Sequence, residues 1–129
     1  MAWGISTYLA NKWLDHLCRN VAYTPPATVY AKFHTNAGDP GANGTANASA
    51  NATRYACTFA AAAAGLISQS NTPEHTLNAT ETIGGVSFWD NPTAGNFLWS
   101  SAALTTKSGT SGDIIRINTD TLTFAPLAT

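Results

Sequence analysis

Residues 84–104, GGVSFWDNPTAGNFLWSSAAL, decide the fold because they predict two apolar strands joined by a turn. The segments GGVSFWD (84–90) and NFLWSSAAL (96–104) are rich in Val, Phe, Trp and Leu, which are residue types that favour or readily enter strands. Between them lies NPTAG (91–95), whose Asn, Pro and Gly are typical of turns. The stretch therefore predicts an antiparallel β-hairpin.

Short apolar segments separated by turn residues continue on both sides of this hairpin. On the C-terminal side we expect a turn at KSGTSGD (107–113) and then a strand at IIRIN (114–118). A short connection at Thr119 and Asp120 leads to the last strand, TLTFAPL (121–127). On the N-terminal side the strand candidates are ATVYAKFH (27–34), RYACTFAAA (54–62) and the Thr-rich HTLNATETI (75–83). Regular spacing of this kind indicates an antiparallel β-sandwich or barrel of about six to eight strands.

The N-terminal segment has the periodicity of an amphipathic helix over about residues 5–20. Its apolar stripe consists of Ile5, Leu9, Trp13 and Leu17, widened by Leu14, Cys18 and Val21. Ser6 or Thr7 can cap the start of this helix, and Asn20 can end it. We therefore predict one mainly β domain spanning residues 1–129, with one N-terminal helix, a β-body at about 27–126 and a long loop at about 36–53.

Composition and charge argue against several classes of partner. Only 10% of the 129 residues are charged, against about 25% in an ordinary soluble domain, and the net charge is −1. A chain this neutral has no overall attraction for nucleic acid. It contains no apolar run of about 18 residues that could span a membrane. Because Lys12, Asp15, His16 and Arg19 interrupt the first segment, we predict no signal peptide and synthesis in a cytosol.

The long loop carries three Asn-x-Ser/Thr triplets, which begin at Asn43, Asn47 and Asn51, and a fourth triplet begins at Asn78. Glycosylation of such triplets requires a secretory pathway, which the N-terminus does not indicate. The small polar residues of the loop turn easily and bury little surface on their own. We therefore interpret the loop as a mobile segment that drapes over a neighbouring subunit, and we expect deletion of residues 42–52 to leave the fold intact.

Residues suited to catalysis or to metal binding do not cluster in the sequence. The only histidines are His16, His34 and His75, and each is expected at the surface, His34 on the polar side of its strand and His75 in a turn. The two cysteines, Cys18 and Cys57, lack the spacing of a zinc site and are expected to be buried free thiols, with one disulfide between them as the alternative. We predict no catalytic residue, no cofactor and no metal.

Three aspartates stand beside Gly, Asn or Pro and are expected to form turns through hydrogen bonds to the backbone: Asp39, Asp90 and Asp113. Trp89 and Trp99 lie among Phe88, Phe97 and Leu98, where packing in a core or between subunits is typical.

Four stretches of the chain together resemble a known family. They are YLANKWLDHLCRNVAYTPPATVYAKFHT (8–35), DPGANGTAN (39–47) leading to RYA (54–56), FWDNPTAGNFLWSSAAL (88–104) and SGDIIRINTDTLTF (111–124). Together they resemble small virion proteins of tailed bacteriophages, whose members are often named phage tail fibre protein. The alanine-rich tract at 60–64 and the extended central loop depart from that pattern.

This resemblance implies a virion structural protein made in the bacterial host cytoplasm. A fibre usually needs a shaft or repeats to reach the host, so our leading hypothesis is a capsid cement or decoration protein. Copies of it, expected as a trimer, would bind the major capsid protein and stabilise the head lattice without covalent bonds. Its candidate contact residues are Trp3, Asn43, Asn47, Asn51, Phe124 and Leu127.

The alternative is a tail-fibre or tail-tip protein that binds a host surface glycan. Aromatic rings can stack on sugars, and the candidates for such stacking are Trp89, Trp99 and Tyr30.

Overall fold

The computed structural model describes residues 3–125 and 128. Within this part the chain forms one helix and eight strands, and all strand pairs are antiparallel, so the predicted mainly β fold is confirmed. Helix α1 covers Thr7–Arg19. The strands are β1 (Val29–Thr35), β2 (Arg54–Cys57), β3 (Leu66–Ser68), β4 (Glu74–Thr76), β5 (Glu81–Trp89), β6 (Phe97–Gly109), β7 (Ile114–Arg116) and β8 (Thr121–Thr123).

The main sheet has the strand order β2-β1-β5-β6 and stays open, with β2 and β6 at its edges. The hairpin predicted from residues 84–104 supplies the inner strand β5 and the edge strand β6, and in it Phe88 pairs with Trp99. The turn between β5 and β6 is closed by Asp90, whose Oδ1 accepts a hydrogen bond of 2.7 Å from the backbone N–H of Asn96. The predicted hairpin is therefore confirmed.

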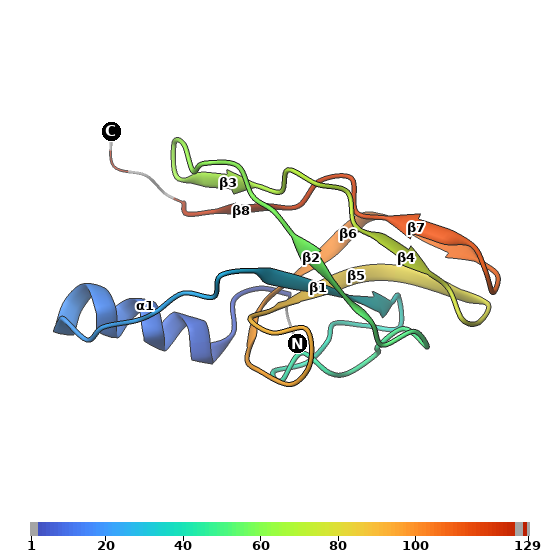
Figure 1. Ribbon diagram of the computed structural model, residues 1–129, viewed down its shortest axis with the longest axis horizontal. Helices are drawn as coiled ribbons and strands as arrows, with labels where there is room; N and C mark the ends of the chain where they lie inside the picture. Colours follow the sequence, from blue (N-terminus) through green and yellow to red (C-terminus); the bar gives the residue numbers. More distant parts are fainter. Residues whose placement is uncertain (1–2, 126–127, 129) are drawn as a thin grey trace.

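Two short ribbons, β3–β8 and β4–β7, cover one face of the main sheet, as Figure 1 shows. The core lies between the ribbons and the sheet. There Phe33 of β1 stacks on the ring of His75 from β4 at 4.3 Å, and Phe88 stacks on Trp99 at 4.5 Å between ring centroids. The ribbons thus act as a second layer, which gives the molecule a sandwich-like core without closing a barrel.

The opposite face of the main sheet is covered by the long loop and by the N-terminal segment. In Figure 1 the loop lies below the sheet, on the side away from the ribbons. A Cβ atom on Gly44 would lie 2.6 Å from the ring of Phe97, and a Cβ atom on Gly85 would lie 2.3 Å from the ring of Trp3. Backbone of the loop at Gly44 and the side chain of Trp3 therefore pack directly on this face, and the loop is part of the fold rather than a draped segment.

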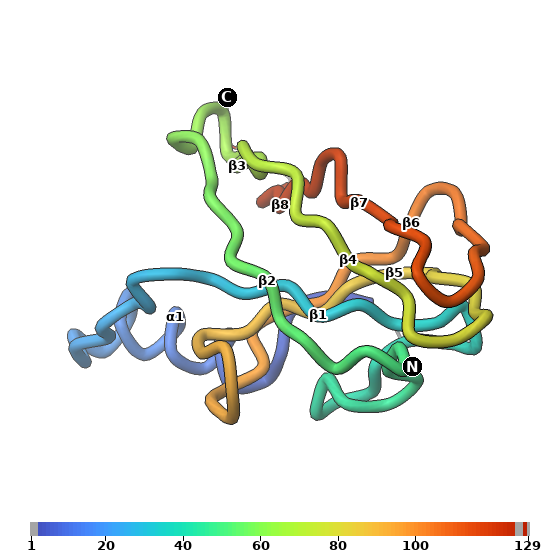
Figure 2. The backbone as a smooth tube through the Cα atoms, turned by 45° about the vertical axis from the view of Figure 1, so that its right-hand side comes forward, coloured from blue at the N-terminus to red at the C-terminus, as the bar shows by residue number. Residues whose placement is uncertain are grey.

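Helix α1 begins and ends where the sequence predicts. The Ser6 hydroxyl accepts a hydrogen bond from the Leu9 N–H, and Asn20 ends the helix in the left-handed conformation at φ 54°. Only Leu9 of the helix is buried, however, because α1 projects beyond the end of the main sheet (Figures 1 and 2). Most of the predicted apolar stripe is therefore left exposed by the described residues.

The strand predictions were wrong in three places. Residues 75–83 form parts of β4 and β5 separated by a bend, because Leu77 turns into the core between them. Strand β3 was not predicted. The chain continues as strand to Gly109 instead of turning at residue 107, and residues 103–106 bulge outward, since Gly85 pairs with Ala102 while Ile83 pairs with Lys107.

Candidate interaction surfaces

An apolar groove lies between α1 and the β3–β8 ribbon, with a volume of about 430 Å³. We call it the α1 groove. Its lining is almost entirely hydrocarbon and comprises Leu9, Trp13, Tyr23, Pro25, Pro26, Val29, Phe59, Ala62, Gly65, Leu66, Ile67, Leu98, Trp99, Leu122 and Phe124. Because the groove opens at the surface, it presents hydrocarbon to water, which is unfavourable unless another molecule covers it.

Beside the groove, the outer part of α1 carries exposed apolar side chains. Leu14 is 59% exposed and Leu17 is 82% exposed, and Val21 just after the helix is also exposed. We call these three residues the α1 ridge. Contiguous apolar surface of this kind usually marks a site of protein association.

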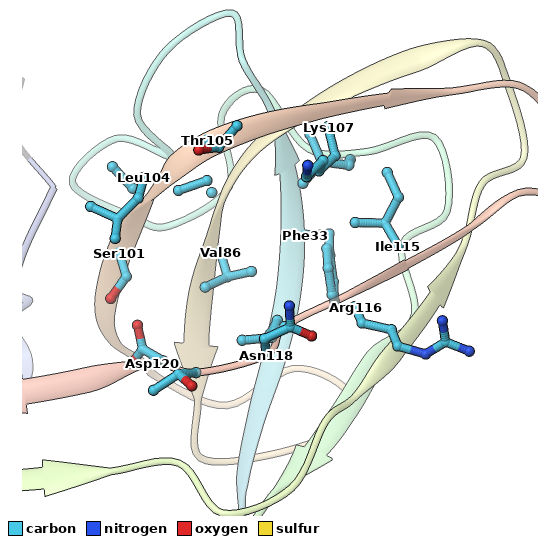
Figure 3. Close-up of a pocket in the computed structure, with 16 residues that line it drawn as sticks. Phe33, Val86, Ser101, Leu104, Thr105, Lys107, Ile115, Arg116, Asn118 and Asp120 are labelled. Carbon is cyan, nitrogen blue, oxygen red and sulfur yellow. The ribbon is translucent and has the colours of Figure 1, made fainter.

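A second cavity, of about 460 Å³, lies between the main sheet and residues 115–120 and is shown in Figure 3. We call it the Asp120 cavity. It is lined by parts of β1, β5, β6 and β7, by the bulge at residues 103–106, and by residues 117–120. Both polar and apolar side chains line it, in contrast to the hydrocarbon lining of the α1 groove.

His34 is buried, which corrects the prediction that it lies at the surface. The reason is the loop, which covers the face of β1 that would otherwise be polar. His34 Nδ1 donates to the carbonyl oxygen of Ala46 at 2.8 Å, so Nε2 accepts from the Ser87 hydroxyl at 2.7 Å. The Trp89 indole N–H in turn donates to the Ser87 oxygen at 2.8 Å. Burial lowers the pKa of His34 to about 4, and the ring is therefore neutral at pH 7.

His75 is also buried, so its predicted surface position is wrong as well. Its Nε2 lies 2.8 Å from the Ser49 hydroxyl, and that hydroxyl donates to Glu81 Oε1 at 2.5 Å. The carboxylate thus binds the serine instead of orienting the imidazole, which is not the order of a catalytic triad. These contacts fasten the loop to β4 and β5.

The residues proposed as lattice contacts have different environments. Trp3 packs on Gly85, and Asn47 and Asn51 donate hydrogen bonds to the carbonyl oxygens of Asp39 and Thr76 within the chain. Asn43 and Phe124 are exposed. Leu127 lies outside the described residues. Of this set, the structure places only Phe124 at the α1 groove.

The rings proposed for glycan stacking are mostly covered. Trp89 and Trp99 are buried; the Arg54 guanidinium lies 3.7 Å from the centre of the Trp89 ring, and Phe88 stacks on Trp99. Tyr30 is half-buried and pairs with Trp89 across β1 and β5. Both tryptophan rings serve the packing of the chain, and Trp99 also lines the α1 groove.

The remaining polar predictions have mixed outcomes. Asp39 and Asp113 accept hydrogen bonds of 2.7 Å from backbone N–H groups in their turns, as predicted. Cys57 is buried, and burial raises its pKa to about 11, whereas Cys18 is exposed, contrary to prediction, because its side of α1 faces solvent. Among residues 3–125 and 128, His, Cys, Asp and Glu form no group that could hold a metal ion. No helix in that part of the chain has the length and hydropathy needed to span a membrane.

Among the described residues, buried polar groups such as His34 and His75 hold the fold together, and apolar surface faces outward at the α1 groove and the α1 ridge. The chain belongs to the family described as Podophage GP4 fiber I protein gp80, whose model matches residues 4–125. This is a family of phage virion proteins, and the resemblance seen in the sequence is confirmed. Comparison with curated proteins gives no match.

Proposed function

We propose that the chain is a fibre subunit of a tailed-phage virion and that it assembles with copies of itself through the α1 groove and the α1 ridge. The observation that carries this proposal is the amphipathic helix. Its sequence has a complete apolar stripe, yet the fold buries only Leu9 of the helix and leaves Leu14 and Leu17 exposed. A second protein surface would complete the burial.

The exposed area of the chain supports association. A monomeric protein of 13.5 kDa exposes about 6,500 Å², whereas this chain exposes 7518 Å². The excess is about 1,000 Å², and a standard protein interface removes about 800 Å² from each partner. The surplus is thus large enough for one interface of ordinary size.

A second copy is the partner that best fits this surface. The chain carries both a protruding apolar ridge and an open apolar groove, so the ridge of one copy can enter the groove of the next. Contacts of this type close into a ring when the rotation between copies allows it, and a trimer is the ring that we expect. The low charge of the chain, 10% of residues, adds little repulsion between copies.

The family description favours a fibre over a capsid cement protein. Assembly of either kind needs no catalytic step, and many weak contacts can hold a symmetric particle together. We further propose synthesis in the bacterial host cytoplasm, where the free thiols Cys18 and Cys57 stay reduced. Contact with the major capsid protein is the competing assignment.

Imaging of the intact particle tests the choice between fibre and head. Gold-labelled antibodies against the chain should bind the tail appendages of purified virions and should not bind particles from which the chain has been deleted. Label confined to the head would contradict the fibre proposal and would support the cement protein.

A further inference from the structure

Two positively charged side chains lie next to each other on the main sheet. Lys32 of β1 and Arg54 of β2 are cross-strand partners, so their side chains project from the same face, and we call them the cation pair. The next residue of β1, Phe33, stacks on His75 in the ribbon layer, so the cation pair lies on the opposite face. Like charges directly opposite each other destabilise a sheet, and the chain therefore keeps this pair at a cost to its stability.

Lys32 is the less satisfied member of the pair. It is half-buried, and among the described residues it makes no hydrogen bond and no ion pair. Burial, and after it the positive charge of Arg54, lowers the pKa of the Lys32 ammonium, which means that the fold disfavours its charged form. An anion placed beside the ammonium would offset both effects.

Arg54 is held in a fixed position by the strands beside it. Its side chain crosses β1 to reach β5, where the guanidinium lies 3.7 Å from the centre of the Trp89 ring. Its Nη1 donates to the carbonyl oxygens of Asn91 and Ala94, in the turn between β5 and β6. The described residues supply no acceptor to Nε or to Nη2. A guanidinium binds a carboxylate through two such neighbouring N–H groups.

The surroundings of the cation pair suit a protein partner better than a small molecule. The pair lines neither the α1 groove nor the Asp120 cavity, whereas small molecules usually bind in concave sites. Tyr30 lies on the same face and pairs with Trp89 across β1 and β5. Trp, Tyr and Arg are the residue types most enriched at the energetic centres of protein interfaces.

The chain itself offers no spare carboxylate to this pair. Burial lowers the pKa of Arg54 and the charge of Asp90 opposes that shift, but both Asp90 oxygens accept hydrogen bonds from Asn96. The other acidic residues are likewise engaged or buried: Asp15 binds Arg19, Asp39 binds Gly41, Glu74 binds Arg116, Glu81 binds Ser49 and Ala50, Asp113 binds Thr110, and Asp120 is buried. A second copy has the same engaged carboxylates, so the missing anion belongs to a different protein.

We infer that Lys32 and Arg54 bind a carboxylate on an acidic segment of another protein, which docks on the β1–β2 side of the main sheet. Arg54 holds the carboxylate through Nε and Nη2, and the Lys32 ammonium supplies a second positive charge beside it. The inference stands apart from the proposed self-assembly, since it uses neither the α1 groove nor the α1 ridge.

Binding of a fluorescently labelled oligoglutamate peptide to the full chain tests this inference, with an oligoglutamine peptide of the same length as the neutral control. We expect binding of the acidic peptide alone, and this binding should weaken as salt is added, because salt screens exposed charges. Backbone amide signals of residues 30–32 and 54–56 should shift in NMR spectra. Lys32→Gln should weaken the binding about five-fold, as expected for an ion pair at a half-exposed site.

Control variants separate the charge of Lys32 from an effect on folding. Lys32→Gln removes the like-charge contact, so it should unfold at the same temperature as the wild type or at a higher one. Lys32→Arg, which keeps the charge, should retain binding, and Lys107→Gln, at an exposed lysine elsewhere, should bind like the wild type. Absence of binding by the wild type, equal binding by Lys32→Gln, or a stronger response of the same amides to inorganic phosphate than to the peptide would overturn the inference. The oligomeric state of the same samples reports separately on the proposed assembly.

Discussion

The indole of Trp13 in α1 packs against the ring of Phe124, just after β8, with their centroids 5.3 Å apart. This contact joins the N-terminal helix to the last ribbon and forms part of the lining of the α1 groove. Because the helix is held in place by Trp13 and by Leu9, its groove exists before any partner arrives. A preformed surface loses less conformational entropy on association than a flexible one, which favours tight assembly.

The buried neutral His34 predicts that the protein loses stability in acid. Its pKa is about 4 in the folded state and about 6.5 when unfolded, so the unfolded state binds the proton more readily. The stabilisation is complete above pH 6.5, falls between pH 6.5 and pH 4, and is absent below. We expect a loss of about 3 kcal/mol in the free energy of unfolding across this window, measured by urea denaturation at each pH.

A glutamine at this position provides the control, since it keeps hydrogen-bonding groups and does not titrate. His34→Gln should be less stable than the wild type at pH 7 but should show a smaller loss between pH 6.5 and pH 4. Burial also lowers the pKa of His75, which acts in the same direction in both proteins and therefore cancels in the comparison. An unchanged pH dependence in His34→Gln would show that His34 is not the group responsible.

The packing of the loop on Phe97 predicts that Gly44 cannot be replaced. Gly44 has φ +69°, and an added Cβ would lie 2.6 Å from the Phe97 ring. Gly44→Ala should lower the free energy of unfolding by roughly 2–4 kcal/mol through backbone strain and steric conflict. Thermal unfolding followed by circular dichroism measures this loss.

Gly112 is the matched control, because it also has positive φ, +95°, but has no atom within 4 Å of an added Cβ. Gly112→Ala should therefore lose about 1 kcal/mol from strain alone. If the loop were a mobile segment, the two variants would be equally destabilised. Because Gly44 packs on Phe97 and Trp89, deletion of residues 42–52 should unfold the face around Trp89, contrary to the expectation from composition.

The sequence predicted those elements whose signals are local. The hairpin at 84–104, the cap at Ser6 and the end of the helix at Asn20 depend on residues adjacent in the chain, and all three agree with the structure. The burial of His34 depends on the loop that crosses its strand. The alternation of polar and apolar residues within the strand does not indicate this loop. A run of small residues likewise gave no sign that Gly44 would pack on Phe97.

The candidate surfaces could not be predicted from the sequence, because they too depend on the tertiary fold. Asp120 was expected in a plain connection between strands, and only the tertiary fold places it under the bulge at residues 103–106. The sequence did indicate the apolar character of the α1 ridge, since Leu14 and Leu17 belong to the predicted apolar stripe. Periodicity shows that such a face is apolar, but it cannot distinguish burial in the chain's own core from burial against another chain.

Sedimentation velocity of Leu17→Glu tests most directly the claim that the α1 ridge and groove join copies of this chain. Leu17 is 82% exposed, so the substitution should leave the thermal unfolding of the subunit unchanged while placing a charge in the interface. Leu104→Glu, at a fully exposed leucine on the bulge, is the control. We predict that the wild type and Leu104→Glu sediment as the same oligomer and that Leu17→Glu sediments as a monomer. A wild-type monomer, or an intact Leu17→Glu oligomer, would contradict the account.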